Sequence, residues 1–126
     1  QVMDCIEYSE GSILSSSNEP SIILIIRGSI DILKKPKNDE SPIDQYLNIF
    51  RYMPGAVIGE ISFLDGQERS AVLKAVEKST CLIMHKKAFD RLRSQDPALA
   101  VVLLENISKE LSRKLRQTNK LFLASE

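Results

Sequence analysis

The chain has 126 residues, 43% apolar and 27% charged, a composition typical of one soluble globular domain and not of a disordered or fibrous protein. Its 17 basic and 17 acidic residues cancel, so the net charge predicts no broad surface for nucleic acid. Cys5 and Cys81 lack CxxC spacing, and the single histidine, His85, lacks neighbouring soft ligands, so we expect no metal site and a cytoplasmic location. No apolar run approaches the ~20 residues of a membrane helix. The chain starts at Gln1 without a methionine, and we interpret it as part of a longer protein.

Residues 7–84 carry the signals of β-strands. The densest run is Ser21–Leu33, which begins with β-branched residues and then alternates apolar with polar ones; Gly28 within it predicts a bulge or bend. The polar stretch Lys34–Asp44 contains prolines and predicts an exposed hairpin loop. Further strands are expected over Tyr46–Met53, Ala56–Gly59, Ser70–Ala75 and Cys81–Met84. Short strands separated by glycines predict a small antiparallel barrel or sandwich.

The segment Gly59–Ala71 has a carboxylate, Glu60, near one end and a guanidinium, Arg69, near the other. The carboxylate can accept a hydrogen bond from a hydroxyl, and the guanidinium offers a planar pair of donors to an oxyanion. A short helix that begins near Glu60 would present unpaired backbone N–H groups, and the small side chains of Ser70 and Ala71 let further N–H groups approach an anion. The alternative is that Glu60 and Arg69 form a weak surface ion pair.

The apolar spacing changes to the helical period after Met84. A short helix is expected over Lys86–Gln95, and Asp96-Pro97 then predicts a helix start with Asp96 as the N-cap. The second helix is expected to run from Pro97 to about Leu123. Its apolar stripe consists of Val101, Leu104, Ile107, Leu111, Leu115, Thr118 and Phe122. The first half can pack against the barrel, whereas the part beyond Leu111 is expected to form a dimer or to act as a lid.

Gly59-Glu60, followed nine residues later by Arg69-Ser70-Ala71 and preceded by Pro54-Gly55, resembles the phosphate-binding cassette of cyclic nucleotide-binding domains. The resemblance extends to Gly11, to Gly28 and to the two C-terminal helices, so it covers nearly the whole chain. The sequence departs from the usual pattern at Glu68, where a proline is common, and at Ile58, where an aromatic residue is frequent and where we expect a packing role.

This resemblance implies a mainly β fold with C-terminal α-helices in a single domain, residues 1–126. The expected parts are an eight-stranded antiparallel β-roll of the jelly-roll type at about 7–84, a short cassette helix, and hinge and lid helices at about 86–123. Only Gln1–Glu7 remains for the helices that usually precede the roll.

The resemblance also implies a role for each residue of the cassette. Glu60 would bind the ribose 2′-hydroxyl, and Gly59 would permit the turn before it. Arg69, with the backbone N–H groups of Ser70 and Ala71, would bind the cyclic phosphate. The long C-terminal helix is similar to that of the catabolite activator family, in which a hydroxyl reaches the purine, so Thr118 and then Asn119 are the candidate base contacts.

The expected function is therefore a sensor that binds cAMP, with cGMP as the other candidate ligand. It would signal through the C-terminal helices to a covalently linked output domain in a transporter, a channel or a regulator. We expect neither catalytic residues nor contact with nucleic acid, and we expect a homodimer through the C-terminal helix. One alternative is a domain unable to bind a nucleotide, appended to a sulfate-permease-type transporter at the cytosolic face of a membrane. Another is a transcription factor of the catabolite activator type whose DNA-binding part lies outside this chain.

Overall fold

The computed structural model describes residues 3–14, 20–34, 36, 42–66 and 71–124. The chain divides into two compact units, Gln1–Lys86 and Lys87–Glu126, and each is described by itself. The first unit contains all the strands, and the second contains nearly all of the two C-terminal helices. The prediction of one domain over residues 1–126 stays a prediction.

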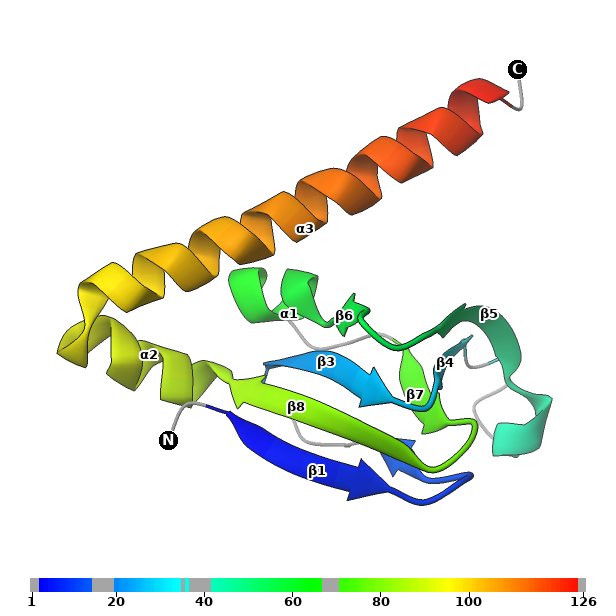
Figure 1. The fold of residues 1–126 in the computed structure, drawn as a ribbon. Helices are drawn as coiled ribbons and strands as arrows, with labels where there is room; N and C mark the ends of the chain where they lie inside the picture. Colours follow the sequence, from blue (N-terminus) through cyan, green and yellow to red (C-terminus); the bar gives the residue numbers. More distant parts are fainter. Residues whose placement is uncertain (1–2, 15–19, 35, 37–41, 67–70, 125–126) are drawn as a thin grey trace. The chain divides into compact units, whose positions relative to one another are not determined.

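The first unit is a β-roll made of two four-stranded sheets (Figure 1). One sheet has the order β1-β8-β3-β6 and the other the order β2-β7-β4-β5, with antiparallel neighbours throughout. The strands are β1 (Asp4–Tyr8), β2 (Ile13–Leu14), β3 (Ser21–Arg27), β4 (Ile30–Lys34), β5 (Leu47–Tyr52), β6 (Val57–Ile58), β7 (Val72–Ala75) and β8 (Ser79–His85). The predicted eight-stranded antiparallel roll is confirmed.

The core of the roll consists of apolar side chains contributed by both sheets. They alternate along the strands with more exposed positions, as expected when one face of each sheet is buried. The buried members are Leu14, Ile23, Ile25, Ile30, Ile58, Leu73, Ala75, Cys81 and Ile83. Ile58 thus has the predicted packing role, and burial, with a smaller effect of Cys5, raises the pKa of the Cys81 thiol.

The predicted strand over Ser21–Leu33 is in fact two strands in different sheets, β3 and β4. Gly28 lies between them with φ +88°, a backbone conformation that glycine adopts without steric cost, so it forms a bend. The Ser79 side chain occupies this corner, where its Oγ accepts a hydrogen bond from the Ser29 backbone N–H at 3.2 Å. The sequence missed the change of sheet because apolar periodicity does not say which sheet a strand joins.

The roll is slightly longer than the predicted 7–84. It begins with β1, in which Asp4 pairs with Ile83, and it ends at His85. Strand β1 is at the edge of its sheet and is only partly buried, which explains its weak periodic signal. The pairing of β4 with β5 is that of a hairpin, and a short 3-10 helix, η1 (Ile43–Gln45), precedes β5. Most of the predicted loop Lys34–Asp44 lies outside the described residues.

The helices are α1 (Glu60–Asp65), α2 (Lys86–Gln95) and α3 (Pro97–Ala124). All three were predicted, and α3 ends one residue beyond the expected position. Asp96 is the predicted N-cap, since its Oδ1 accepts a hydrogen bond from the Leu99 N–H at 3.2 Å. Within the described part of the chain, no helix is long and apolar enough to cross a membrane.

Candidate functional site

The candidate site begins at helix α1, which a glycine bounds at each end. Gly59 precedes the helix with φ +91° and Gly66 follows it with φ +75°. Phe63 N–H donates to the Gly59 carbonyl at 3.0 Å, and Gly66 N–H donates to the Ser62 carbonyl at 2.9 Å. These two positive-φ turns allow the chain to leave β6, form less than two helical turns and turn away again.

Helix α1 has one buried face and one exposed face. Glu60 and Phe63, which are three residues apart, are 4% and 0% exposed. Ile61 and Leu64 are 66% and 44% exposed. A carboxylate buried to this extent is uncommon, because burial of a charge is costly unless the charge is paired or hydrogen-bonded. Whether Glu60 pairs with Arg69 is not tested, since Arg69 lies outside the described residues.

The predicted site residues do not all lie in one described part of the structure. Gly59 and Glu60 lie together at the start of α1, and Ala71 lies directly before β7 and is partly buried. Arg69 and Ser70 are outside the described residues. Thr118 is exposed on α3, in the second unit, and its Oγ1 donates a hydrogen bond to the Lys114 carbonyl at 3.1 Å.

Sequence reasoning missed a contact between α1 and the end of the roll. The Lys86 Nζ lies 5.2 Å from the centre of the Phe63 ring, a distance typical of a cation–π interaction. The Lys86 backbone N–H donates to the Pro20 carbonyl at 2.9 Å. No local pattern in the sequence connects Phe63 with Lys86, because the two residues lie far apart in the chain.

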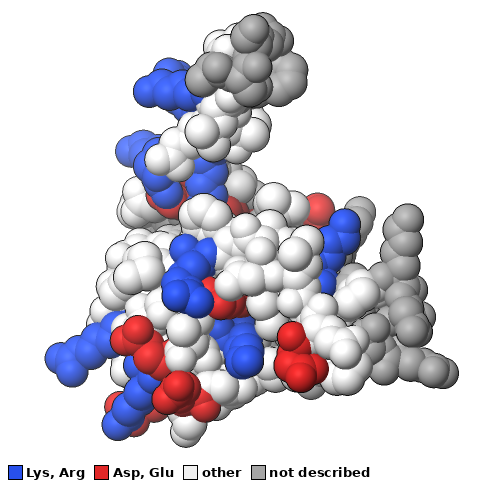
Figure 2. Space-filling model, turned by 90° about the vertical axis from the view of Figure 1, so that its right-hand side faces the viewer, with Lys and Arg blue, Asp and Glu red and all other residues white. Residues whose placement is uncertain are grey.

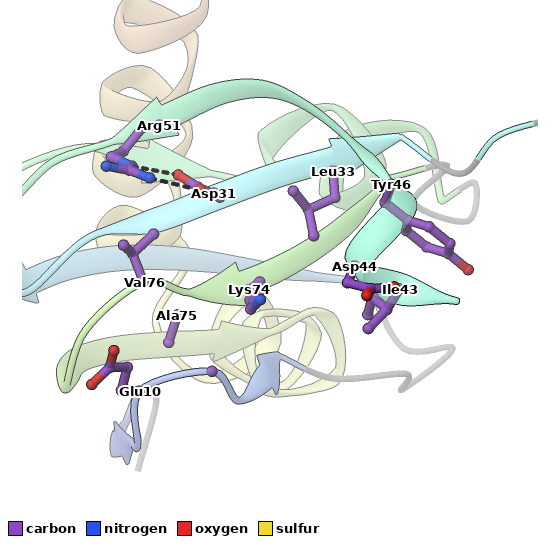
Figure 3. Close-up of a pocket in the computed structure, with 11 residues that line it drawn as sticks. Glu10, Asp31, Leu33, Ile43, Asp44, Tyr46, Arg51, Lys74, Ala75 and Val76 are labelled. Carbon is purple, nitrogen blue, oxygen red and sulfur yellow. Dashed lines mark hydrogen bonds and ion pairs between the residues drawn. The ribbon is translucent and has the colours of Figure 1, made fainter. Parts of the chain in front are cut away.

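A separate hollow of about 290 Å³ lies on the sheet β2-β7-β4-β5 (Figure 3). Residues of the strands and of the segments before β2 and β5 line it, and neither Gly59 nor Glu60 is among them. Its lining includes Glu10, Asp31, Leu33, Asp44, Tyr46, Arg51 and Lys74. The hollow is therefore distinct from the predicted site.

Asp31 is the most buried charge in this hollow, with a side chain that is 10% exposed. Its carboxylate accepts hydrogen bonds from Arg51 Nε at 2.7 Å, Arg51 Nη2 at 3.0 Å and Asn48 Nδ2 at 2.7 Å. The hydrogen bond and charge of Asp31 raise the pKa of Arg51. Because these partners join β4 to β5, we interpret the cluster as a structural clasp.

Charges on the visible face of the molecule are mixed in sign (Figure 2). Blue and red side chains lie side by side there, with uncharged residues around them. In the part of the chain that the structure describes, no group of three or more His, Cys, Asp or Glu residues could hold a metal ion.

The family model described as the cyclic nucleotide-binding domain matches residues 5–96, from β1 through α2. The chain belongs to this family. A search of curated proteins found no match. The family match agrees with the resemblance of the cassette and with the observed β-roll.

Solved structures share this fold. A cyclic nucleotide-binding domain from Methylobacillus flagellatus is 24% identical, with a TM-score of 0.80 over 99% of this chain and 68% of that one. The catabolite activator protein of Thermus thermophilus is 25% identical, with a TM-score of 0.70, and this chain covers 55% of it. The regulatory domain of Toxoplasma gondii PKA, crystallised with cAMP, is 17% identical, with a TM-score of 0.59 over 86% of this chain and 40% of that one.

Proposed function

We propose that this chain is a regulatory module that binds cAMP within the β-roll. The observation that carries the proposal is the buried carboxylate of Glu60 at the start of α1, in a chain of the cyclic nucleotide-binding family. A buried carboxylate is stabilised when it accepts hydrogen bonds, and the ribose 2′-hydroxyl of a cyclic nucleotide is a suitable donor.

In this proposal Arg69 neutralises the cyclic phosphate, and the N–H groups of Ser70 and Ala71 donate to its oxygens. A planar guanidinium can donate two parallel hydrogen bonds to a phosphate, which a lysine cannot do with the same geometry. Gly59 supplies the positive-φ turn that brings Glu60 to the start of the helix. No residue is assigned a catalytic role.

Thr118 is proposed as the contact to the base. Because its hydroxyl donates to the Lys114 carbonyl, the oxygen lone pairs are available to accept a hydrogen bond. The 6-amino group of adenine is a donor, whereas guanine has an acceptor oxygen at that position. This difference favours cAMP over cGMP.

The bound nucleotide would change the preferred arrangement of α2 and α3 and thereby act on an output domain. A ligand can shift such an equilibrium only by its difference in affinity for the two arrangements. The output domain would be part of a transporter, a channel or a regulator. The proposed location is the cytoplasm, where cyclic nucleotides signal.

Calorimetric titration of the protein with cAMP and cGMP tests the proposal, with the variant Arg69→Ala measured beside the wild type. We expect saturable binding, tighter for cAMP, and a loss of at least tenfold in affinity for Arg69→Ala. The expected loss corresponds to a charged hydrogen bond of about 1.5–3 kcal/mol.

Arg27→Ala is the matched control, because Arg27 is an exposed arginine at the end of β3 in the same unit. Its affinity should equal that of the wild type. The proposal would be contradicted if the wild-type protein shows a cooperative thermal unfolding transition, and is therefore folded, but gives no binding heat with either nucleotide. Its unfolding temperature would then also not shift when a nucleotide is added. The domain would then be an interaction module that does not bind a nucleotide.

A further inference from the structure

Phe63 anchors helix α1 to the first unit. Its ring is 0% exposed, whereas the neighbouring Leu64 is 44% exposed, so the helix has few large side chains to fix its position. The flanking Gly59 and Gly66 lack side chains that could restrain the two ends. The orientation of α1 therefore depends strongly on what surrounds the Phe63 ring.

Lys86 places its ammonium group over that ring, at 5.2 Å from the ring centre. Its own backbone is fixed, because it follows β8 directly and its N–H donates to the Pro20 carbonyl at 2.9 Å. Lys86 is also the first residue of α2. The Lys86 backbone is thus bonded to the residue that precedes β3, and its side-chain ammonium contacts the short helix α1.

We propose that Lys86 is a positioning residue for the ligand site, which orients α1 through Phe63 and thereby aims the Glu60 carboxylate. This inference rests on the proposed function for its effect on nucleotide binding. Glu60 lies one helical turn before Phe63 on the same buried face, so a tilt of α1 about Phe63 displaces the Glu60 carboxylate. A displacement of 1 Å is enough to weaken a hydrogen bond substantially.

Lys86→Met tests the inference, because methionine retains an unbranched side chain of similar length and removes the charge. We expect cAMP to bind about three- to tenfold more weakly, as estimated for a partly buried cation–π contact. The affinity for 2′-deoxy-cAMP should change little, because this analogue lacks the hydroxyl that Glu60 would bind. The preference for cAMP over 2′-deoxy-cAMP should therefore fall.

Two controls separate positioning from a general loss of stability. Lys86→Arg keeps a cation above the ring and should restore the wild-type preference within about twofold. Lys87→Met removes the charge of an adjacent exposed lysine and should change neither affinity. If Lys86→Met weakens both nucleotides equally, or neither, Lys86 does not position Glu60 and the inference fails.

Amide hydrogen exchange without a nucleotide separates failure of this inference from failure of the proposed function. Lys86→Met should increase exchange in residues 60–66 several-fold, and Lys87→Met should not. If the wild type does not bind cAMP, the proposed function fails, and the exchange of α1 alone decides whether Lys86 fixes this helix. Unchanged exchange in Lys86→Met overturns the inference.

Discussion

Gly28 shows how one residue can determine the path of the chain between the two sheets. A Cβ atom at this position would overlap the Ser79 side chain and would lie 2.7 Å from the Lys78 carbonyl oxygen. The φ of +88° is also unfavourable for any residue with a side chain. Gly11 has a similar φ of +85°, but a Cβ there would meet no atom within 4 Å.

We predict that Gly28→Ala lowers the free energy of unfolding by about 3 kcal/mol, because backbone strain of about 1–2 kcal/mol adds to the cost of overpacking. Urea denaturation measures this change. Gly11→Ala is the matched control and should cost only about 1–2 kcal/mol, the strain alone. Equal losses in the two variants would show that the contact with Ser79 contributes nothing.

The hairpin of β4 and β5 is the element in which a buried charge has a clear structural role. Strand β5 is at the edge of its sheet and buries none of its residues fully, so apolar packing holds it weakly. Asp31 on β4 compensates by accepting hydrogen bonds from Asn48 and Arg51 on β5. These hydrogen bonds help to hold β5 in the sheet although the strand, predicted over Tyr46–Met53, is largely exposed.

We predict that Asp31→Asn lowers the free energy of unfolding by about 2 kcal/mol, since it replaces charged hydrogen bonds and leaves the Arg51 guanidinium without its carboxylate. The Arg51 side chain is 51% exposed, so solvent screening limits the free energy that its ion pair with Asp31 contributes. Chemical denaturation of Asp31→Asn and of Asp44→Asn provides the comparison, because Asp44 is exposed in the same hollow. An equally large loss of unfolding free energy in Asp44→Asn would show that the hydrogen bonds of Asp31 do not stabilise the hairpin.

At the scale of the whole molecule, the second unit contains a long helix with exposed apolar residues. Leu115, Leu121 and Leu123 on α3 are 63%, 74% and 66% exposed. Such residues are costly in water when they lie close together on one helix. Of these three residues only Leu115 belongs to the predicted apolar stripe, and the expectation that α3 pairs with a second copy stays a prediction.

We predict that the protein is a dimer at micromolar concentration and that Leu115→Glu makes it a monomer, because a charge would be buried in the contact between helices. Light scattering coupled to size-exclusion chromatography measures the mass. Gln117→Glu adds a charge away from the stripe and should leave the dimer intact. A monomeric wild type would contradict this prediction.

The sequence by itself determined the class of fold and the position of the cassette. Alternation, glycine placement and the Asp96 N-cap are local signals, since each depends on residues that are neighbours in the chain. They predicted a small antiparallel barrel or sandwich, the ends of α2 and the start of α1. The motif from Gly59 to Ala71 indicated the family, and with it the β-roll. That family is shown by the match over residues 5–96.

Only the tertiary structure decided which strands share a sheet, that Glu60 is buried and that Lys86 lies over Phe63. Each of these depends on the approach of segments that are distant in sequence. Local periodicity gives the face on which a side chain lies but not the neighbour that it meets. The break of Ser21–Leu33 into two strands at Gly28 was decided in the same way, because the Ser79 side chain that fills the corner comes from the opposite end of the roll's sequence.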